Sequence, residues 1–410
     1  MTSVLFVHNN LPGQYLRLIE RLQELDGFAL AGIGTTRARG IAGLKMKRYA
    51  ITSDGIAEVH PFARRFDLES RRAEAVLYAA VAMRDEGFVP DVIFGHPGWG
   101  EVLPLKEVFP KARLYCYSEY FYRADNDFGF DQQAERFGLP NRVGLDIKNA
   151  STLISLAAST AGIAPTQWQR SLFPAELQSK IKIIHDGIDT ARIRPESAAE
   201  LRLPSGNVLT SRDEVITYVA RNLEPYRGYH VLMRALPKIL AERPGAHVVI
   251  VGGDGTSYGS PPQDGRRWKD VFLDEVADRL PRDRVHFLGR VSYDDYLNVL
   301  GVSSAHIYLT YPFVLSWSML EAMAAECLVI GSRTAPVEEV IEDRRNGLLV
   351  PFNDPQQLAD TVIDVLAKPK TFEKYRKAAR DTVIDRFDFE TRSWPQFEAL
   401  LNRGEALARE

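Results

Sequence analysis

The feature that most constrains this chain is a strand–helix alternation that runs through it twice. In the first half, short apolar runs predict strands at residues 3–7, 28–33, 91–94, 113–117, 162–164 and 182–184. Between them, apolar residues recur at helical spacing, as in Leu16, Ile19 and Leu22. Short apolar strands separated by helices are typical of a parallel sheet that is covered on both faces.

The alternation starts again in the second half. Predicted strands lie at 215–220, 246–251, 285–288, 305–309, 328–331 and 347–350. The stretch Thr190–Arg212 between the halves is polar, holds two prolines and shows little periodicity, which favours a domain linker. We therefore expect two α/β domains, 1–189 and 190–386, with a ligand in the cleft between the carboxyl ends of their strands.

Composition excludes several classes of protein. The net charge of −3 leaves no basic excess for a nucleic-acid partner. Cys116 and Cys327 have neither metal-ligand nor redox spacing, and the apolar N-terminal run is too short for a signal peptide, so we expect a cytoplasmic chain. The uncharged stretch Asn149–Gln169 is rich in Ser and Thr, which favours a buried helix, with Leu153, Ile154, Leu156 and Ala157 inward, over a membrane span.

Two arginines flank a strand-to-helix loop in the second half. Arg221 ends a predicted strand, and Arg227 stands just before a helix that begins near Gly228. Two guanidinium groups beside a helix N-terminus form a strong site for a dianion. The alternative is a pair of solvated surface arginines.

A second loop leads from a strand into a helix at Ser316, Trp317 and Ser318. Free backbone N–H groups at such a helix start can hold a phosphate. Glu321, one turn into the helix, can accept hydrogen bonds from a ribose diol. The alternative is that Glu321 is a capping-box partner.

These segments resemble the family 4 glycosyltransferases in order and rough spacing. The resemblance rests on Arg221…Arg227-Gly228, Gly252-Gly253, Phe287-Leu288-Gly289-Arg290-Val291 and Ser318–Ala324, and on His96–Glu101 and Ser118–Arg123, which look like a bacterial subgroup. It implies a retaining, metal-independent enzyme of the GT-B fold, with two Rossmann-like domains facing each other across a cleft. It also implies that the helices at about 387–410 pack back on the first domain.

The resemblance assigns roles in a donor site for a nucleoside-diphosphate sugar, UDP- or GDP-linked. Arg221 and Arg227 would hold the diphosphate, helped by the backbone of Ser316, Trp317 and Ser318, and Glu321 would bind the ribose. Arg290 and Val291 would lie against the base, and Gly252 and Gly253 would allow close approach of the chain. In the first domain, Gly13 would lie near the donor, His96 would contact the donor sugar, and Glu119 would bind acceptor hydroxyls.

Two positions depart from the family pattern. Phe313 stands where the family usually has a glutamate that faces the donor sugar, and Asp186 stands where an asparagine usually precedes the glycine. Phe313 therefore removes the basis for carrying sugar selectivity over from relatives.

The implied reaction moves a sugar to a hydroxyl of a glycan, lipid-linked or protein acceptor, in bacterial glycan or glycoconjugate synthesis. No cofactor and no nucleic acid are expected; peripheral membrane contact and oligomeric state are left open. Competing readings are a metal-dependent transferase using Asp125-Asn126-Asp127, a same-fold epimerase or phosphorylase, and a non-catalytic nucleotide-sugar binding protein suggested by Phe313. A dehydrogenase is disfavoured because Gly253-Asp254-Gly255 lacks the third glycine in register.

Overall fold

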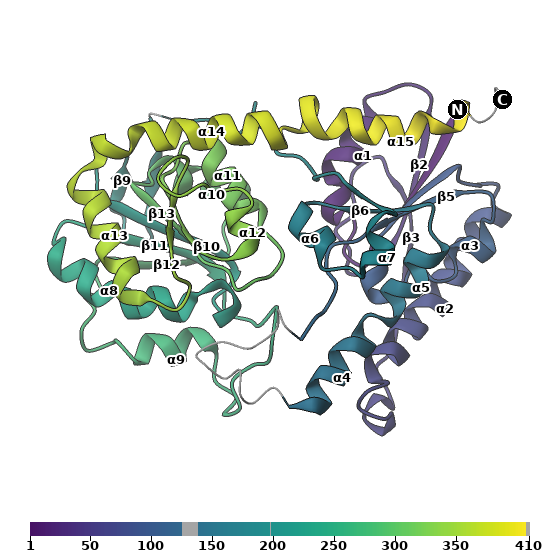
Figure 1. The fold of residues 1–410 in the computed structure, drawn as a ribbon, viewed down its shortest axis with the longest axis horizontal. Helices are drawn as coiled ribbons and strands as arrows, with labels where there is room; N and C mark the ends of the chain where they lie inside the picture. The colour runs from purple at the N-terminus through teal and green to yellow at the C-terminus, as the bar shows by residue number, and fades with distance from the viewer. Residues whose placement is uncertain (125–137, 197, 407–410) are drawn as a thin grey trace. The chain divides into compact units, whose positions relative to one another are not determined.

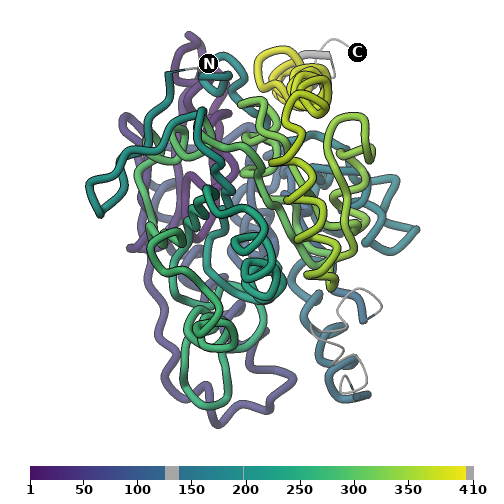
Figure 2. Tube along the Cα trace, turned by 90° about the vertical axis from the view of Figure 1, so that its left-hand side faces the viewer, coloured from purple at the N-terminus to yellow at the C-terminus, as the bar shows by residue number. Residues whose placement is uncertain are grey.

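The computed structural model (Figure 1) describes residues 1–124, 138–196 and 198–406, which are the coloured parts of the trace in Figure 2. The described chain divides into two compact units. The first unit contains the described residues up to Gly187 and those from Phe389 onward. The second unit runs from Ile188 to Asp388.

The first unit is built on a seven-stranded parallel sheet with the order β3-β2-β1-β4-β5-β6-β7. Its strands are β1 (Thr2–Val7), β2 (Phe28–Thr35), β3 (Lys45–Tyr49), β4 (Val92–Gly95), β5 (Arg113–Tyr117), β6 (Ala161–Ala164) and β7 (Ile181–Ile183). The chain builds the sheet outward from β1 to β3, and then returns to the other side of β1 for β4. This reversal is the arrangement of doubly wound nucleotide-binding folds.

Helices cover both faces of this sheet. They are α1 (Leu16–Gln23), α2 (Arg64–Asp85), α3 (Leu105–Val108), α4 (Leu139–Lys148), α5 (Ala150–Ala158), α6 (Gln167–Ser171), α7 (Ala175–Gln178) and α15 (Trp394–Ala406). Alternate residues of each strand face opposite layers. Val4 and Phe6 of β1 pack with α1 and α15, whereas Leu5 and Val7 pack with α2 and α3.

The last described helix, α15, belongs to the first unit although its sequence follows the second. Trp394 and Phe397 are buried in the same cluster as Val4 of β1. The guanidinium of Arg113 donates to the carbonyl oxygens of Leu400 and Leu401, at 2.6 and 2.7 Å. Figure 1 shows α15, at the yellow end of the colour scale, beside α1. The helix thereby completes one layer of the first unit.

The second unit repeats the pattern with a six-stranded parallel sheet of order β12-β11-β10-β13-β14-β15. Its strands are β10 (Val215–Asn222), β11 (His247–Gly253), β12 (Val285–Gly289), β13 (Ala305–Tyr308), β14 (Val329–Ser332) and β15 (Leu348–Val350). Its helices are α8 (Tyr229–Glu242), α9 (Trp268–Asp274), α10 (Tyr293–Gly301), α11 (Trp317–Ala324), α12 (Ala335–Glu338), α13 (Pro355–Ala367) and α14 (Glu373–Phe387).

The second sheet is also covered on both faces. Helices α8, α9 and α13 pack with Ile216, Ile250 and Ile307 on one face. Helices α10, α11 and α14 pack with Tyr308 and Val329 on the other. The two parallel sheets confirm the predicted fold class of two Rossmann-like α/β domains.

The stretch predicted as a domain linker, Thr190–Arg212, holds secondary structure that its sequence pattern did not indicate. This stretch contains an antiparallel hairpin of β8 (Glu200–Arg202) and β9 (Val208–Thr210). Leu201 and Leu209 are buried in one cluster with Val249 and Val299. The sequence did not indicate these short strands because each of them buries only one side chain, so neither shows an apolar run.

The predicted inward face of α5 is wrong in part, because Leu156 is fully buried as predicted but Ala157 is exposed. Ile154 is 51% exposed, whereas Ser151 and Ser155 are buried beside Leu156. The Ser151 hydroxyl donates to the buried carboxylate of Glu69 at 2.6 Å. This hydrogen bond offsets the free-energy cost of burying a polar side chain. Among the described helices, none combines the length and the apolar character that a membrane crossing requires.

We predict that Gly100→Ala destabilises the first unit more than Gly87→Ala does. Both glycines have left-handed backbones, with φ of +95° and +88°, which cost a residue with a side chain about 1–2 kcal/mol. A Cβ atom at Gly100 would also lie 2.2 Å from the Glu69 carbonyl oxygen, but nothing lies within 4 Å of one at Gly87. Urea unfolding of both variants beside the parent chain measures the difference; equal losses would contradict the steric argument.

A second prediction concerns His306, which is fully buried in β13. Burial lowers its pKa from 6.5 to about 4. Below pH 6.5 the unfolded chain binds a proton that the folded chain does not, so stability falls as the pH drops toward 4, by about 3 kcal/mol in total. His306→Asn should therefore lose less stability than the parent between about pH 7 and 4.5 in unfolding titrations. His60→Asn, at an exposed position, is the control; a His306→Asn profile parallel to the parent would contradict this account.

Candidate functional site

Several of the predicted site residues lie where each sheet reverses its strand order. In the first unit the reversal lies between β1 and β4, and in the second between β10 and β13. Loops that leave two parallel strands at such a point diverge to opposite faces and open a crevice outside the carboxyl ends. In each unit, a ligand can therefore bind at the carboxyl end of the sheet, beside the point where the strand order reverses.

In the first unit, His96 follows β4 and is 5% exposed. Its Nδ1 accepts a hydrogen bond from the Gly98 backbone N–H at 3.1 Å. In the neutral ring the proton is therefore on Nε2. This Nε2 lies 3.3 Å from Oε2 of Glu119, to which it donates. Two residues that were predicted separately thus form one hydrogen-bonded pair.

Glu119 is held from two further directions. Its Oε1 accepts from the Gln14 amide at 3.3 Å, and its backbone oxygen accepts from the Gln169 amide at 2.6 Å. Gln14 follows Gly13, which adopts a left-handed backbone with φ of +51°. The structure therefore brings the predicted residues Gly13, His96 and Glu119 to one place, by way of Gln14.

Sequence reasoning missed His8 and Trp99. His8 directly follows β1, and its Nδ1 accepts a hydrogen bond from the Asn10 backbone N–H at 2.8 Å. Burial, reinforced by the neighbouring His96, lowers the pKa of His8 well below 6.5. The rings of His96 and Trp99 stack with their centroids 4.1 Å apart. A histidine directly after the first strand was the available signal for His8.

In the second unit, the structure separates the two arginines by exposure. Arg221 is exposed near the end of β10, whereas Arg227 is buried. The Nη1 of Arg227 donates to Thr310 Oγ1 at 2.8 Å and to the Val314 carbonyl oxygen at 3.0 Å, and lies 3.3 Å from the Tyr308 hydroxyl. Arg227 is thus not a solvated surface arginine, because it joins the loop after β10 to the loop after β13.

The start of α11 is already capped from within the unit. The Ser316 backbone N–H donates to the Tyr308 hydroxyl at 2.8 Å, and the Ser318 backbone N–H donates to Ser316 Oγ at 3.3 Å. Trp317, which lies between them, is 40% exposed. Two of the three amides expected to face a phosphate therefore have acceptors in the protein.

Glu321 lies one turn further along α11 and meets two tyrosines of α10. The Tyr293 hydroxyl donates to Oε1 and the Tyr296 hydroxyl donates to Oε2, both at 2.9 Å. Ser316 is the N-cap, so the capping-box position three residues later is Met319 rather than Glu321. The capping-box alternative for Glu321 does not fit this geometry.

The remaining predicted donor-site residues lie at the ends of β11 and β12. A Cβ atom at Gly252 would come within 2.8 Å of the Ala220 carbonyl oxygen, and one at Gly253 within 2.8 Å of Arg290 Nε. Packing inside the unit thus requires a glycine at 252, where a backbone oxygen is in the way, whereas the contacts at 253 are the ends of the Asn222 and Arg290 side chains, which can move. Arg290 is exposed, and the neighbouring Val291 packs against the core.

Sequence reasoning also missed a loop that Glu224 organises. Glu224 is fully buried, and its carboxylate accepts from the backbone N–H groups of Ser257 and Tyr258 at 3.0–3.2 Å. Burial raises the pKa of Glu224, while these amides and the charges of Arg227 and Arg221 oppose that effect. The partners are more than thirty residues apart, so no local sequence signal identifies them.

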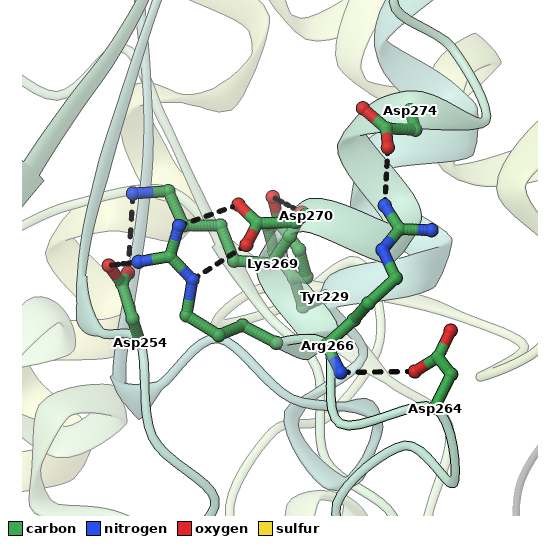
Figure 3. Close-up of polar contacts among 8 residues, drawn as sticks. Tyr229, Asp254, Asp264, Arg266, Lys269, Asp270 and Asp274 are labelled. Atoms are coloured by element: carbon green, nitrogen blue, oxygen red, sulfur yellow. Dashed lines mark hydrogen bonds and ion pairs between the residues drawn. The ribbon is translucent and has the colours of Figure 1, made fainter.

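An ion-pair network fixes the other end of the same loop (Figure 3). Asp254 pairs with Arg267 at 3.1 Å and with Lys269 at 3.2 Å, and Arg267 also pairs with Asp270. The Arg266 backbone N–H donates to Asp264, and its guanidinium pairs with Asp274 of α9. The segment between β11 and α9 is thereby attached at both ends.

This attachment places Tyr258 in a group of three rings, Tyr226, Tyr258 and Phe313, which we call the aromatic cluster. The Tyr258 and Phe313 centroids are 4.8 Å apart, and the Tyr226 and Phe313 centroids are 5.8 Å apart. The Arg227 Cζ lies 5.3 Å from the Tyr258 centroid and 5.9 Å from the Phe313 centroid. Phe313 thus shares the surroundings of Arg227.

Within residues 1–124, 138–196 and 198–406, no three His, Cys, Asp or Glu side chains are grouped as metal ligands. The Asp125-Asn126-Asp127 stretch lies outside the described residues. Cys116 and Cys327 are free and buried.

Two family models match the chain. Residues 27–193 match the glycosyl transferase family 4 group, and residues 204–382 match glycosyl transferases group 1. D-inositol 3-phosphate glycosyltransferase of Saccharomonospora viridis is 27% identical over 49% of this chain and 45% of its own length. Glycogen synthase of Mycobacterium tuberculosis is 26% identical over 52% of this chain and 46% of its own length. The matches thus span about half of each relative.

Solved structures match over the whole length. Sucrose-phosphate synthase from Thermosynechococcus elongatus has a TM-score of 0.72 at 15% identity and covers 100% of both chains. HepE from Anabaena, in complex with UDP and glucose, has a TM-score of 0.64 at 18% identity and covers 98% of this chain and 99% of its own. Because the two family models account for most of both units, the chain belongs to the glycosyltransferases of the GT-B fold, with its N-terminal half in the family 4 group.

Proposed function

We propose that this chain transfers a sugar from a nucleoside-diphosphate sugar to an acceptor hydroxyl, with retention of anomeric configuration and without a metal. The observation that carries the proposal is the position of Arg227. Its guanidinium is fixed by Thr310 and Val314 at the strand-order reversal of the second sheet. A preorganised cation at this edge suits an anion that gains charge as it leaves.

Arg221 supplies the second positive charge of the proposed donor site. Arg221 lies near the end of β10, and the loop that follows this strand holds both Glu224 and the buried Arg227. A diphosphate that entered there would meet one fixed and one exposed guanidinium. Arg221 can adjust to the ligand, whereas Arg227 sets its position, and both can form charge-assisted hydrogen bonds.

The chemistry proposed for transfer needs little else from the protein. The nucleoside diphosphate leaves from the sugar, and the acceptor attacks the same face while the leaving phosphate takes its proton. No enzyme nucleophile is required, since the main task is to stabilise the developing phosphate charge. In the first unit, the carboxylate of Glu119, which His96 and Gln14 orient, is the proposed acceptor for sugar hydroxyls.

The comparisons support a UDP-linked donor, and the proposal includes a GDP-linked one because the binding site for the base is not assigned. HepE was solved with UDP and glucose, and other relatives are named for glycosyl transfer to inositol phosphate or for glycogen synthesis. We extend this class to the present chain, with a glycan, lipid-linked or protein acceptor and a role in bacterial glycan synthesis. No cofactor is needed in this scheme, and a cytoplasmic enzyme, at or away from the membrane face, has access to such donors.

The test is a thermal-shift panel of nucleoside diphosphates and their sugars in EDTA. A ligand at about 100 times its dissociation constant should stabilise the folded chain by about 2.7 kcal/mol. Arg221→Ala should weaken binding by about tenfold or more, because it removes a charged hydrogen-bond donor from the diphosphate. Arg202→Ala, at an exposed position on the β8–β9 hairpin, is the matched control and should bind like the parent.

Three outcomes would contradict the proposal. The first is that no nucleoside diphosphate or nucleotide sugar shifts the parent chain. The second is that binding disappears in EDTA and returns with a divalent cation, which would indicate a metal-dependent site. The third is equal binding by Arg221→Ala and Arg202→Ala, which would remove Arg221 from the site.

A further inference from the structure

The aromatic cluster lies beside the arginine that is proposed to bind the diphosphate. Arg227 Cζ is within 6 Å of the ring centroids of both Tyr258 and Phe313. In a nucleoside-diphosphate sugar, the sugar is attached directly to the terminal phosphate. Side chains at this distance from a phosphate-binding guanidinium are therefore within reach of the sugar.

The position of Phe313 is fixed by its neighbours on both sides. Tyr226 packs edge-to-face against it at 5.8 Å, and Tyr258 packs at 4.8 Å in a tilted arrangement. Tyr258 is itself held through its backbone by the buried Glu224. The neighbouring Val314 carbonyl accepts from Arg227, so the backbone beside Phe313 is attached to the same guanidinium. Phe313 is half-buried, so its neighbours do not enclose the residue completely.

The aromatic cluster differs in chemistry from a site that binds sugar hydroxyls through hydrogen bonds. The ring of Phe313 offers no strong hydrogen-bond acceptor, so a sugar hydroxyl pressed against it loses its bonds to water without replacement. Burying a polar group without a hydrogen-bond partner weakens binding. A methyl group in the same place gains by leaving water and by contact with the ring.

We propose that Phe313, within the aromatic cluster, selects a donor sugar that carries a methyl group, either as an acetamido substituent or as a 6-deoxy carbon. This inference rests on the proposed function, because it assumes that Arg227 holds the donor diphosphate. It assigns Phe313 the role of a specificity-determining residue that contacts the sugar. One methyl contact of this kind discriminates by about tenfold or more.

The experiment measures donor dissociation constants by titration calorimetry, because binding needs no acceptor. Two pairs of donors differ in whether the sugar carries a methyl group. UDP-N-acetylglucosamine has an acetamido group where UDP-glucose has a hydroxyl, and GDP-6-deoxymannose has a methyl group where GDP-mannose has a hydroxymethyl group. The parent chain should favour the methyl-bearing member of one pair by about tenfold or more. The pair that shows the preference identifies whether the methyl belongs to an acetamido group or to a 6-deoxy carbon.

Two variants test the residue. Phe313→Ala should reduce the preference to about threefold or less, and Phe313→Glu should reverse it by supplying an acceptor for hydroxyls. Binding of UDP and GDP without a sugar is the control for folding and for the diphosphate site, and should change by less than about threefold in Phe313→Ala. In Phe313→Glu the readout is the ratio of the two donors of a pair, so that a uniform effect of the new charge on the diphosphate cancels.

The possible failures are separable. A parent chain that binds nucleoside diphosphates but favours neither methyl-bearing donor would overturn the selectivity and leave the donor site standing. A preference that persists unchanged in Phe313→Ala would also overturn it, since another residue would then be responsible. A parent chain that binds no nucleoside diphosphate would overturn the proposed function, and the selectivity with it.

Discussion

Both units depend on the reversal of strand order next to their first strand. A parallel sheet must cover both faces with helices, so the chain winds one way from the first strand and then the other. The loops after β1 and β4, and those after β10 and β13, are the ones that this winding separates. Every predicted site residue that the structure brings together belongs to one of these loops or is held by one. The strand order of the sheet, and not the loops alone, thus determines where the candidate side chains lie.

Burial of Arg227 shows how this position is made rigid. A guanidinium away from water is costly unless its donors find acceptors. Here the acceptors come from Thr310 and Val314, in the loop that starts on the other side of the reversal. The same bonds that remove the cost also hold the two loops together. A cation that is already oriented does not need to reorganise when an anionic group forms beside it.

The sequence was informative where structure follows from local pattern. The parallel strands and their helices could be predicted because apolar runs and helical spacing recur along each half. The edge strand β3 was missed since its sequence, Lys45–Tyr49, is mostly polar and buries mainly Tyr49. The inward face of α5 was misjudged because Ser151 is stabilised by Glu69, a partner far away in the sequence.

The candidate site divides in the same way. Arg221, Arg227, His96, Glu119 and Glu321 could be picked out because each follows a strand or begins a helix, where parallel sheets expose functional side chains. The hydrogen-bond and packing partners of these residues could not be predicted, because contacts between distant parts of the chain determine them. Glu224 reaches across more than thirty residues to Tyr258, and His8 meets His96 only when β1 and β4 pair. Local patterns thus identify positions, and tertiary contacts decide what each position can do.

The surroundings of Glu321 show why existing hydrogen bonds need not exclude a ligand. Burial, reinforced by Glu321 itself, raises the pKa of Tyr296 well above 10, so its hydroxyl keeps its proton and remains a donor. An ionised carboxylate has about four lone-pair directions on its two oxygens. One hydroxyl from Tyr293 and one from Tyr296 use two of them and fix the plane of the carboxylate. By fixing that plane, the two tyrosines set the direction in which Glu321 would meet a ribose diol in the proposed donor site.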